Sequence, residues 1–304
     1  MNHEHARMRA GLLLGVAAYL CWGFMPLYFR QIAHVAASEI VAHRVIWSLL
    51  FLAALIALLR RWASVRVALA SRRGLLILAA SALLIGANWL VFTYAVTNNY
   101  VLSGSLGYYL NPLVNILLGV ALLKETLSRA QKLATALAAA GVASLAIGAG
   151  AGTGLWISLA LAASFALYGF LRKVAPAGPL EGMAIETAMI LPLAAVWVAM
   201  IEGNGSASFS SAGPLTAFLV AFGGVVTAIP LLLFTGAARR LPYSTLGFLQ
   251  YIAPTLQFAT GVYYGEALTM AHLTCFAAIW SALALVALDG WRGARHARSA
   301  GETP

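Results

Sequence analysis

Long apolar runs recur along the whole chain, and they constrain its fold more than any other feature. A helix of about 20 residues crosses the roughly 30 Å hydrocarbon core of a bilayer. Only 9% of the 304 residues are charged, against about 25% in a typical soluble domain. The sequence therefore predicts an all-α integral membrane protein with ten transmembrane helices. We expect the spans at residues 11–30, 39–59, 74–96, 102–123, 133–150, 154–172, 181–201, 214–237, 244–265 and 269–289.

Basic residues indicate how these spans are oriented. With the N-terminus in the cytoplasm, both chain ends and the even-numbered loops carry every Lys and Arg except Arg30 and Arg44. Such a bias is the positive-inside rule for an even number of spans. The net charge of +10 is thus a topology signal, and we expect no nucleic-acid partner. The first apolar run is too long for a signal peptide, and we expect it to be retained.

The two halves of the chain resemble each other at a period of about 142 residues. NPLVNILLG, at 111–119, aligns with APTLQFATG, at 253–261, and after one residue of slippage Glu125 meets Glu266. Because each half has five spans, the second half must enter the membrane from the opposite side, as in the inverted repeats of transporters. We expect a first repeat at 8–150, a second at 151–292 and a basic cytoplasmic tail at 293–304.

Charged residues inside the apolar runs are candidate functional groups. Glu39 and His43 share one face of the second span, and Arg44 points about 100° away from His43. Arg44 lies roughly 7 to 9 Å inside the outer end, and it either snorkels to the interface or faces a wet cavity. Glu186, its repeat mate, lies at a similar depth from the cytoplasmic side. Our hypothesis is that Arg44 guards an outer vestibule and Glu186 an inner one.

Amide and aromatic residues mark a second candidate region. Tyr108, Asn111 and Asn115 form a stripe on one helix face, and the ninth span repeats this pattern. Such side chains either bond neighbouring helices together or line a cavity. Pro112 and Pro254 each free a backbone carbonyl, so we expect hinges there. The predicted cavity residues are Trp22, His43, Arg44, Asn88, Trp89, Tyr108, Asn111, Asn115, Tyr168, Glu186, Gln250 and Gln257.

Several kinds of chemistry leave no trace in the sequence. It has no G-x-x-x-x-G-K-[ST] loop and no H-E-x-x-H helix, and no G-x-S-x-G turn. Cys21 and Cys275 lie within apolar segments and are interpreted as packing residues. We expect no catalytic residues, no metal and no cofactor.

Four stretches together resemble a known family. LGYYLNPLVNILLGVALLKETLS (106–128), LGFLQYIAPTLQFATGVYYGEAL (246–268), AHRVIWSLLF and ANWLVFTYAV are similar to the RarD-type branch of the EamA transporters, in the drug/metabolite transporter superfamily. The resemblance covers about residues 8–292. It implies ten helices in two inverted five-helix halves, a central cavity lined by spans one, three, four, six, eight and nine, and export of small metabolites or drug-like solutes.

The sequence and the resemblance favour a secondary transporter of the bacterial cytoplasmic (inner) membrane. It would move a small amphipathic solute by alternating access. Coupling to protons, through Glu186 and His43, and a facilitator driven by the solute gradient are alternatives, as is a channel. An intramembrane enzyme acting on lipid would need a clustered nucleophile and base. The expected partners are the solute and the lipid bilayer, and no oligomeric state is predicted.

Overall fold

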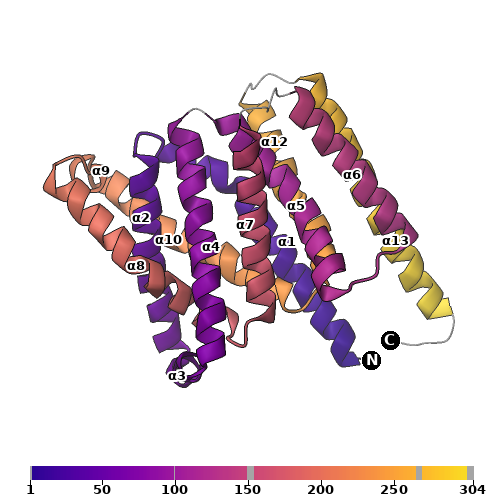
Figure 1. Ribbon diagram of the computed structural model, residues 1–304, viewed down its shortest axis with the longest axis horizontal. Coiled ribbons are helices and arrows are strands. Elements are labelled where there is room, and N and C mark those ends of the chain that lie inside the picture. Colours follow the sequence, from indigo (N-terminus) through magenta and orange to yellow (C-terminus); the bar gives the residue numbers. More distant parts are fainter. Residues whose placement is uncertain (1, 99, 149–153, 265–268, 300–304) are drawn as a thin grey trace.

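The computed structural model describes residues 2–98, 100–148, 154–264 and 269–299, and within them the chain is helical without a strand. Residues 300–304 of the predicted tail and Glu266 lie outside this part. Figure 1 shows the helices as a bundle. In chain order they are α1 (Asn2–Gln31), α2 (Ala37–Leu58), α3 (Trp62–Ala70), α4 (Arg72–Thr97), α5 (Val101–Leu123), α6 (Arg129–Gly148), α7 (Leu155–Val174), α8 (Pro179–Gly203), α9 (Ser208–Ser211), α10 (Pro214–Ala238), α11 (Tyr243–Gln250), α12 (Ile252–Tyr263) and α13 (Met270–Ser299).

The all-α prediction is confirmed. Within the described ranges, nine helices are each long and apolar enough to cross a membrane. They coincide with nine of the ten predicted spans. The remaining span, which is the ninth in chain order and was predicted at 244–265, is occupied by α11 and α12 together. This ninth span in chain order is broken, so neither piece reaches membrane-spanning length alone.

The break in the ninth span follows from Pro254. Proline has no backbone N–H and its ring crowds the carbonyl four residues earlier, which here belongs to Gln250. α11 ends at Gln250, and α12 begins at Ile252. Pro112, at the matching position in α5, lies inside a continuous helix. The two prolines therefore differ in their local effect, and hinge motion at either stays a prediction.

One helix was not expected. The predicted loop between the second and third spans contains α3, nine residues long and too short to cross a bilayer. None of its residues is buried, and Trp62, Val67 and Leu69 expose about half or more of their surface. Arg66 lies among these apolar side chains. A short helix with exposed apolar side chains and a basic residue is typical of a segment that lies along a membrane surface.

The ends of the chain lie on one side of the bundle. Figure 1 shows the start of α1 and the end of α13 at the lower edge, where α3 also lies. We call this edge the terminal side. The loops after α5, α7 and α10 lie there too, because each of these helices starts at the opposite side. This placement agrees with an even number of spans.

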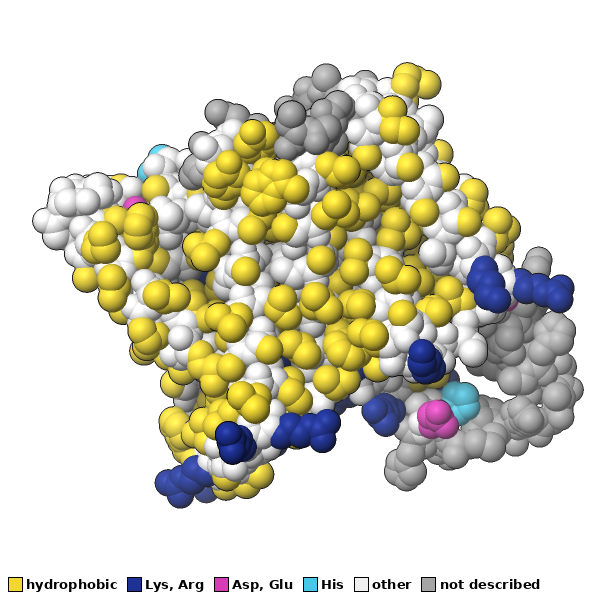
Figure 2. Space-filling view, viewed as in Figure 1, with side chains coloured by type: hydrophobic (Ala, Val, Ile, Leu, Met, Phe, Trp, Pro, Cys, Tyr) yellow, Lys and Arg dark blue, Asp and Glu magenta, His cyan; other side chains and the backbone are white. Residues whose placement is uncertain are grey.

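The outer surface is suited to lipid. Large apolar side chains such as Leu58, Leu83, Ile147 and Leu193 expose three quarters or more of their surface. In Figure 2 hydrophobic side chains are spread over the middle of the visible face, and the visible Lys and Arg side chains lie toward the lower edge. So many exposed large apolar side chains are not expected on a monomeric soluble protein. The chain is a multi-pass membrane protein.

The packing of the helices supports the predicted repeat. The repeat pairs α1 with α7, α2 with α8, α4 with α10, α5 with α11 and α12, and α6 with α13. If each helix is replaced by its repeat mate, the α1–α10 contact becomes the α7–α4 contact, and both contacts are present. In the same way the α5–α7 contact becomes the α12–α1 contact, and both are present. The contacts α2–α8, α5–α11 and α6–α13 map onto themselves. The division at residues 150 and 151 stays a prediction.

Candidate functional site

A cavity of about 120 Å³ lies in the middle of the bundle, between the two halves. Its volume leaves room for several water molecules or a small organic solute. Eight helices contribute to its wall, and those of the second half face those of the first. The lining residues are Tyr19, Trp22, Met25, Phe29, Arg44, Ile85, Asn88, Trp89, Phe92, Gly107, Tyr108, Asn111, Leu161, Phe165, Thr227, Leu231, Gln250, Ala253, Pro254 and Gln257.

Helical periodicity explains why these residues meet. Ile85, Asn88, Trp89 and Phe92 of α4 are spaced three and four apart, which puts them on a single face. The pairs on α7 and α10 are also four apart, and the lining residues of α1 follow the same rule. Spans one, three, four, six, eight and nine supply the wall, as the resemblance implies. Arg44, from the second span, is the one addition among the lining residues.

Arg44 brings a cation to this wall. Its Nε donates a hydrogen bond of 2.6 Å to Thr227 Oγ1. Its guanidinium carbon lies 5.4 Å from the ring centre of Trp89 and 5.7 Å from that of Phe29. Aromatic faces attract cations, and more strongly where water is scarce. The guanidinium is therefore held in place by one hydrogen bond and two aromatic rings.

The amide side chains of the wall divide into two kinds. Asn88 donates to Leu161 O and Ser164 Oγ, and Gln257 donates to Trp22 O at 3.1 Å. These bonds join the two halves across the cavity. Asn111 is buried, and its Oδ1 has no hydrogen-bond partner among the described residues. A buried acceptor of this kind is costly to leave unpaired, so a bound solute or water is its natural partner.

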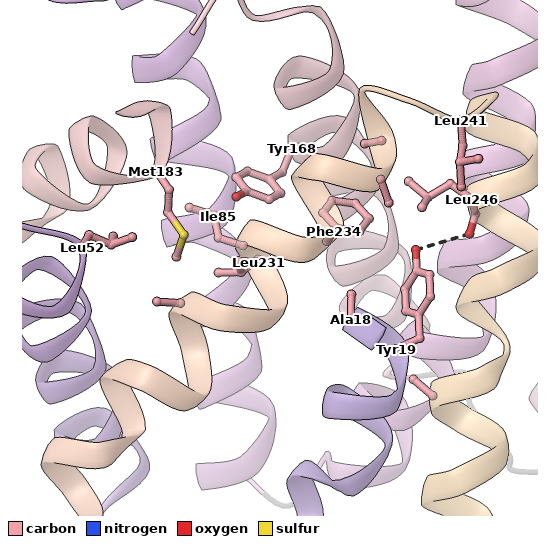
Figure 3. Packing of buried hydrophobic residues seen from close by; sticks show 14 of the residues in the cluster. Ala18, Tyr19, Leu52, Ile85, Tyr168, Met183, Leu231, Phe234, Leu241 and Leu246 are labelled. Carbon is pink, nitrogen blue, oxygen red and sulfur yellow. Dashed lines mark hydrogen bonds between the residues drawn. The ribbon is translucent and has the colours of Figure 1, made fainter. Parts of the chain in front are cut away.

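The cavity is closed toward the terminal side by apolar packing. Ala18, Tyr19, Phe234 and Leu246 have no exposed surface. Figure 3 shows these side chains packed together, with the Tyr19 hydroxyl donating to Leu246 O at 3.3 Å. A further set of buried residues extends this layer, made of Ala237, Ala238, Leu241 and Tyr243. These fully buried side chains form a packed layer between the cavity and the terminal side.

Polar contacts between the halves reinforce this closure. The Glu125 carboxylate, after α5, accepts hydrogen bonds from Tyr243 N at 2.6 Å, Ser244 N at 2.8 Å and Ser244 Oγ at 2.7 Å. Glu125 thereby caps the first turn of α11, where free N–H groups and the helix dipole favour an anion. Arg61 of the first half pairs with Glu181 of the second at 2.7 Å.

Four of the predicted cavity residues lie outside the wall. His43 stacks on Phe209, with ring centres 4.4 Å apart. Asn115 donates a 2.6 Å hydrogen bond to Gln250 Oε1 and so links α5 to α11. Tyr168 is buried in the core beside Phe165. Glu186 accepts a hydrogen bond from Ser81 and lies 3.5 Å from Arg172 Nη1. A role for them in transport stays a prediction.

Several residues of the wall were not predicted from the sequence. Phe165, Thr227 and Leu231 look like ordinary residues of a membrane helix. Only their positions in the repeat could have indicated them. Each lies on the helix face that corresponds to the face carrying polar residues in the matching helix of the other half. Extending each polar residue by three and four positions would also have found Ile85 and Phe92. Glu125 appeared only as a repeat match, and its capping role needed the structure.

A lipid-facing helical bundle with a central cavity, lined mainly by apolar side chains with a few polar groups, is the architecture of a membrane transport protein. The comparisons with known proteins agree. A model of the EamA-like transporter family matches residues 9–147, which is α1 to α6. An uncharacterized transporter of Pseudomonas aeruginosa is 43% identical over 96% of this chain and 97% of its own. Protein RarD of Escherichia coli is 44% identical over 92% of this chain and 95% of its own.

The chain belongs to the RarD-type branch of the EamA family of transporters. A solved structure titled only as a crystal structure of protein has a similar fold, with a TM-score of 0.70 at 18% identity, over 92% of this chain and 98% of that one.

Proposed function

We propose that the protein exports small amphipathic solutes across the bacterial inner membrane as a secondary transporter, by alternating access. The observation that carries this proposal is the cavity between the halves, which has a few polar groups in a mainly apolar wall and is bounded by a fully buried apolar layer on one side. A site that opens to one side at a time is what alternating access requires. The basic terminal side supports cytoplasmic termini, so this conformation would face outward.

The lining suggests the kind of solute. Aromatic and aliphatic side chains predominate, with a few polar groups from Arg44, Tyr108 and the amides. Such walls bind ligands with an apolar body and a small number of polar atoms. The second half of the cycle would break the closure below the cavity and form an equivalent one above it. Arg44 and Glu186 would then exchange partners at opposite vestibules.

Counterflow in liposomes tests the proposal. Purified protein is reconstituted in vesicles loaded with pools of unlabelled metabolites, and uptake of labelled members is followed with and without a pH gradient. We expect saturable exchange that is accelerated by solute on the opposite side. Arg44→Ala and Glu186→Ala variants that insert normally should transport at a reduced rate.

Two results would contradict the proposal. Flux that rises linearly with concentration, without stimulation from the opposite side, would indicate a channel. Turnover of a labelled lipid by the purified protein would indicate an enzyme. A dependence of the rate on the pH gradient would decide between proton coupling and a facilitator.

A further inference from the structure

Arg44 is a cation in the wall of the cavity without an acidic partner among the described residues. The two ion pairs of the described chain are Arg61 with Glu181 and Arg172 with Glu186. The remaining described carboxylates are engaged elsewhere or lie at the chain start. Glu39 accepts from Ser208 N and Phe209 N, Glu125 caps α11, Glu202 accepts from Ser210 Oγ, Asp289 accepts from Ser128 Oγ, and Glu4 lies in the first turn of α1.

The guanidinium is oriented for a ligand. Thr227 Oγ1 accepts from Nε and itself donates to Gly223 O at 2.7 Å, which fixes the hydroxyl and through it the arginine. No described residue accepts a hydrogen bond from Nη1 or Nη2. A planar guanidinium with free terminal nitrogens matches the two oxygens of a carboxylate. Thr227 is thus a positioning residue, and Arg44 offers the binding surface.

The other lining residues indicate what the non-carboxylate part of such a ligand is like. Trp22, Trp89, Phe92 and Phe165 line the same cavity as Arg44, and the Trp89 ring centre lies 5.4 Å from the guanidinium carbon. A charged guanidinium within an apolar, largely enclosed wall is expensive to leave uncompensated. An organic anion with an aromatic or aliphatic body satisfies both features, whereas a small inorganic anion would leave the aromatic faces unused.

We propose that Arg44 binds the carboxylate of the transported solute, and that the aromatic wall binds its apolar body. This inference rests on the proposed function, because it takes the cavity as the solute site. It makes Arg44 the residue that selects monocarboxylate solutes over neutral ones of the same shape.

Binding of matched probes tests the assignment. Phenylacetate, 3-phenylpropionate and hexanoate are compared with their neutral amides by isothermal titration calorimetry on the purified full chain. We expect each acid that binds to do so at least tenfold more tightly than its amide, as a charge-assisted hydrogen-bonded pair implies. Arg44→Gln should remove this preference, and Arg44→Lys should retain part of it. Arg30→Gln is the matched control, because Arg30 is exposed and stacks on Tyr264.

A second pair of variants separates the loss of the hydrogen bond to Arg44 from a loss of folding. Thr227→Val keeps the shape of the side chain but removes the acceptor for Arg44 Nε, and should weaken acid binding severalfold while amide binding is unchanged. Thr227→Ser keeps the hydroxyl acceptor and should bind the acids as tightly as the parent protein. Three results would overturn the proposal: equal binding of acids and amides, no binding of any acid at millimolar concentration, or chloride binding as tightly as the acids. Counterflow of a neutral solute with equal binding would refute only the role of Arg44, whereas no counterflow of any solute would refute the proposed function.

Discussion

Removing the charge of Glu125 should open the terminal side. Its carboxylate makes three hydrogen bonds of 2.6 to 2.8 Å to the start of α11, and these cross from the first half to the second. Hydrogen bonds to a charged group contribute about 1.5 to 3 kcal/mol each. Glutamine keeps one acceptor oxygen but loses the charge that favours the helix N-terminus, which adds about 0.3 to 1 kcal/mol.

Because water forms some of the hydrogen bonds that the glutamine does not, the Glu125→Gln substitution should destabilise the closed state by about 2 kcal/mol relative to the state open to the terminal side. Each 1.4 kcal/mol changes an equilibrium about tenfold, so the population open to the terminal side should rise about 30-fold. The prediction applies to the equilibrium between two conformations and leaves the folded bundle otherwise unchanged. Stability measured by thermal unfolding should therefore fall only modestly.

Thiol labelling measures this opening. Cys21 and Cys275 are first replaced by alanine, and Ala18→Cys then places a thiol in the sealed layer, where the native residue has no exposed surface. In the Glu125→Gln background, its rate of reaction with a maleimide should rise in proportion to the open population. Glu4→Gln removes the same charge near the chain start and is the matched control. An unchanged or slower rate in a folded Glu125→Gln variant would refute the reasoning.

Three further substitutions test the packing. Asn115→Leu leaves Gln250 Oε1 without its 2.6 Å donor and should cost about 1 to 3 kcal/mol, seen as a lower midpoint in thermal unfolding; an unchanged midpoint would contradict it. Gly247→Ala puts a Cβ 2.8 Å from Pro112 O and should lower the free energy of unfolding by about 1 to 3 kcal/mol. An unchanged free energy of unfolding would mean that α5 and α11 can move apart without cost. Arg61→Gln breaks a pair whose arginine is half exposed, so its cost should stay below about 1 kcal/mol; a larger loss would mean that the pair is shielded from water.

The sequence was informative about the spans because hydrophobic length and basic loops are direct physical signals. The short helix in the loop before the third span was not predicted, since α3 covers only nine residues and is too short to register as a span. The ninth span was predicted as one helix because hydropathy does not register the backbone effect of Pro254. These differences are local and leave the topology unchanged.

The site was only partly predictable for a different reason. A polar residue in a membrane helix must find a partner, but sequence does not say whether that partner is a solute or another helix. Asn111 and Arg44 face the cavity, whereas Asn115 bonds Gln250 and Glu186 lies beside Arg172. Apolar lining residues such as Leu161 carry no mark that separates them from those facing lipid. Only the arrangement of helices distinguishes these cases.

Two-sided access to the cavity tests the central claim most directly. Ala253 lines the cavity and is buried, so an Ala253→Cys variant without other cysteines reports its accessibility. Membrane-impermeant thiol reagents are applied to right-side-out and to inverted vesicles, with and without a transported solute. We expect labelling from both sides, with protection by solute from each. Labelling from one side only, under every condition, would contradict alternating access at this cavity.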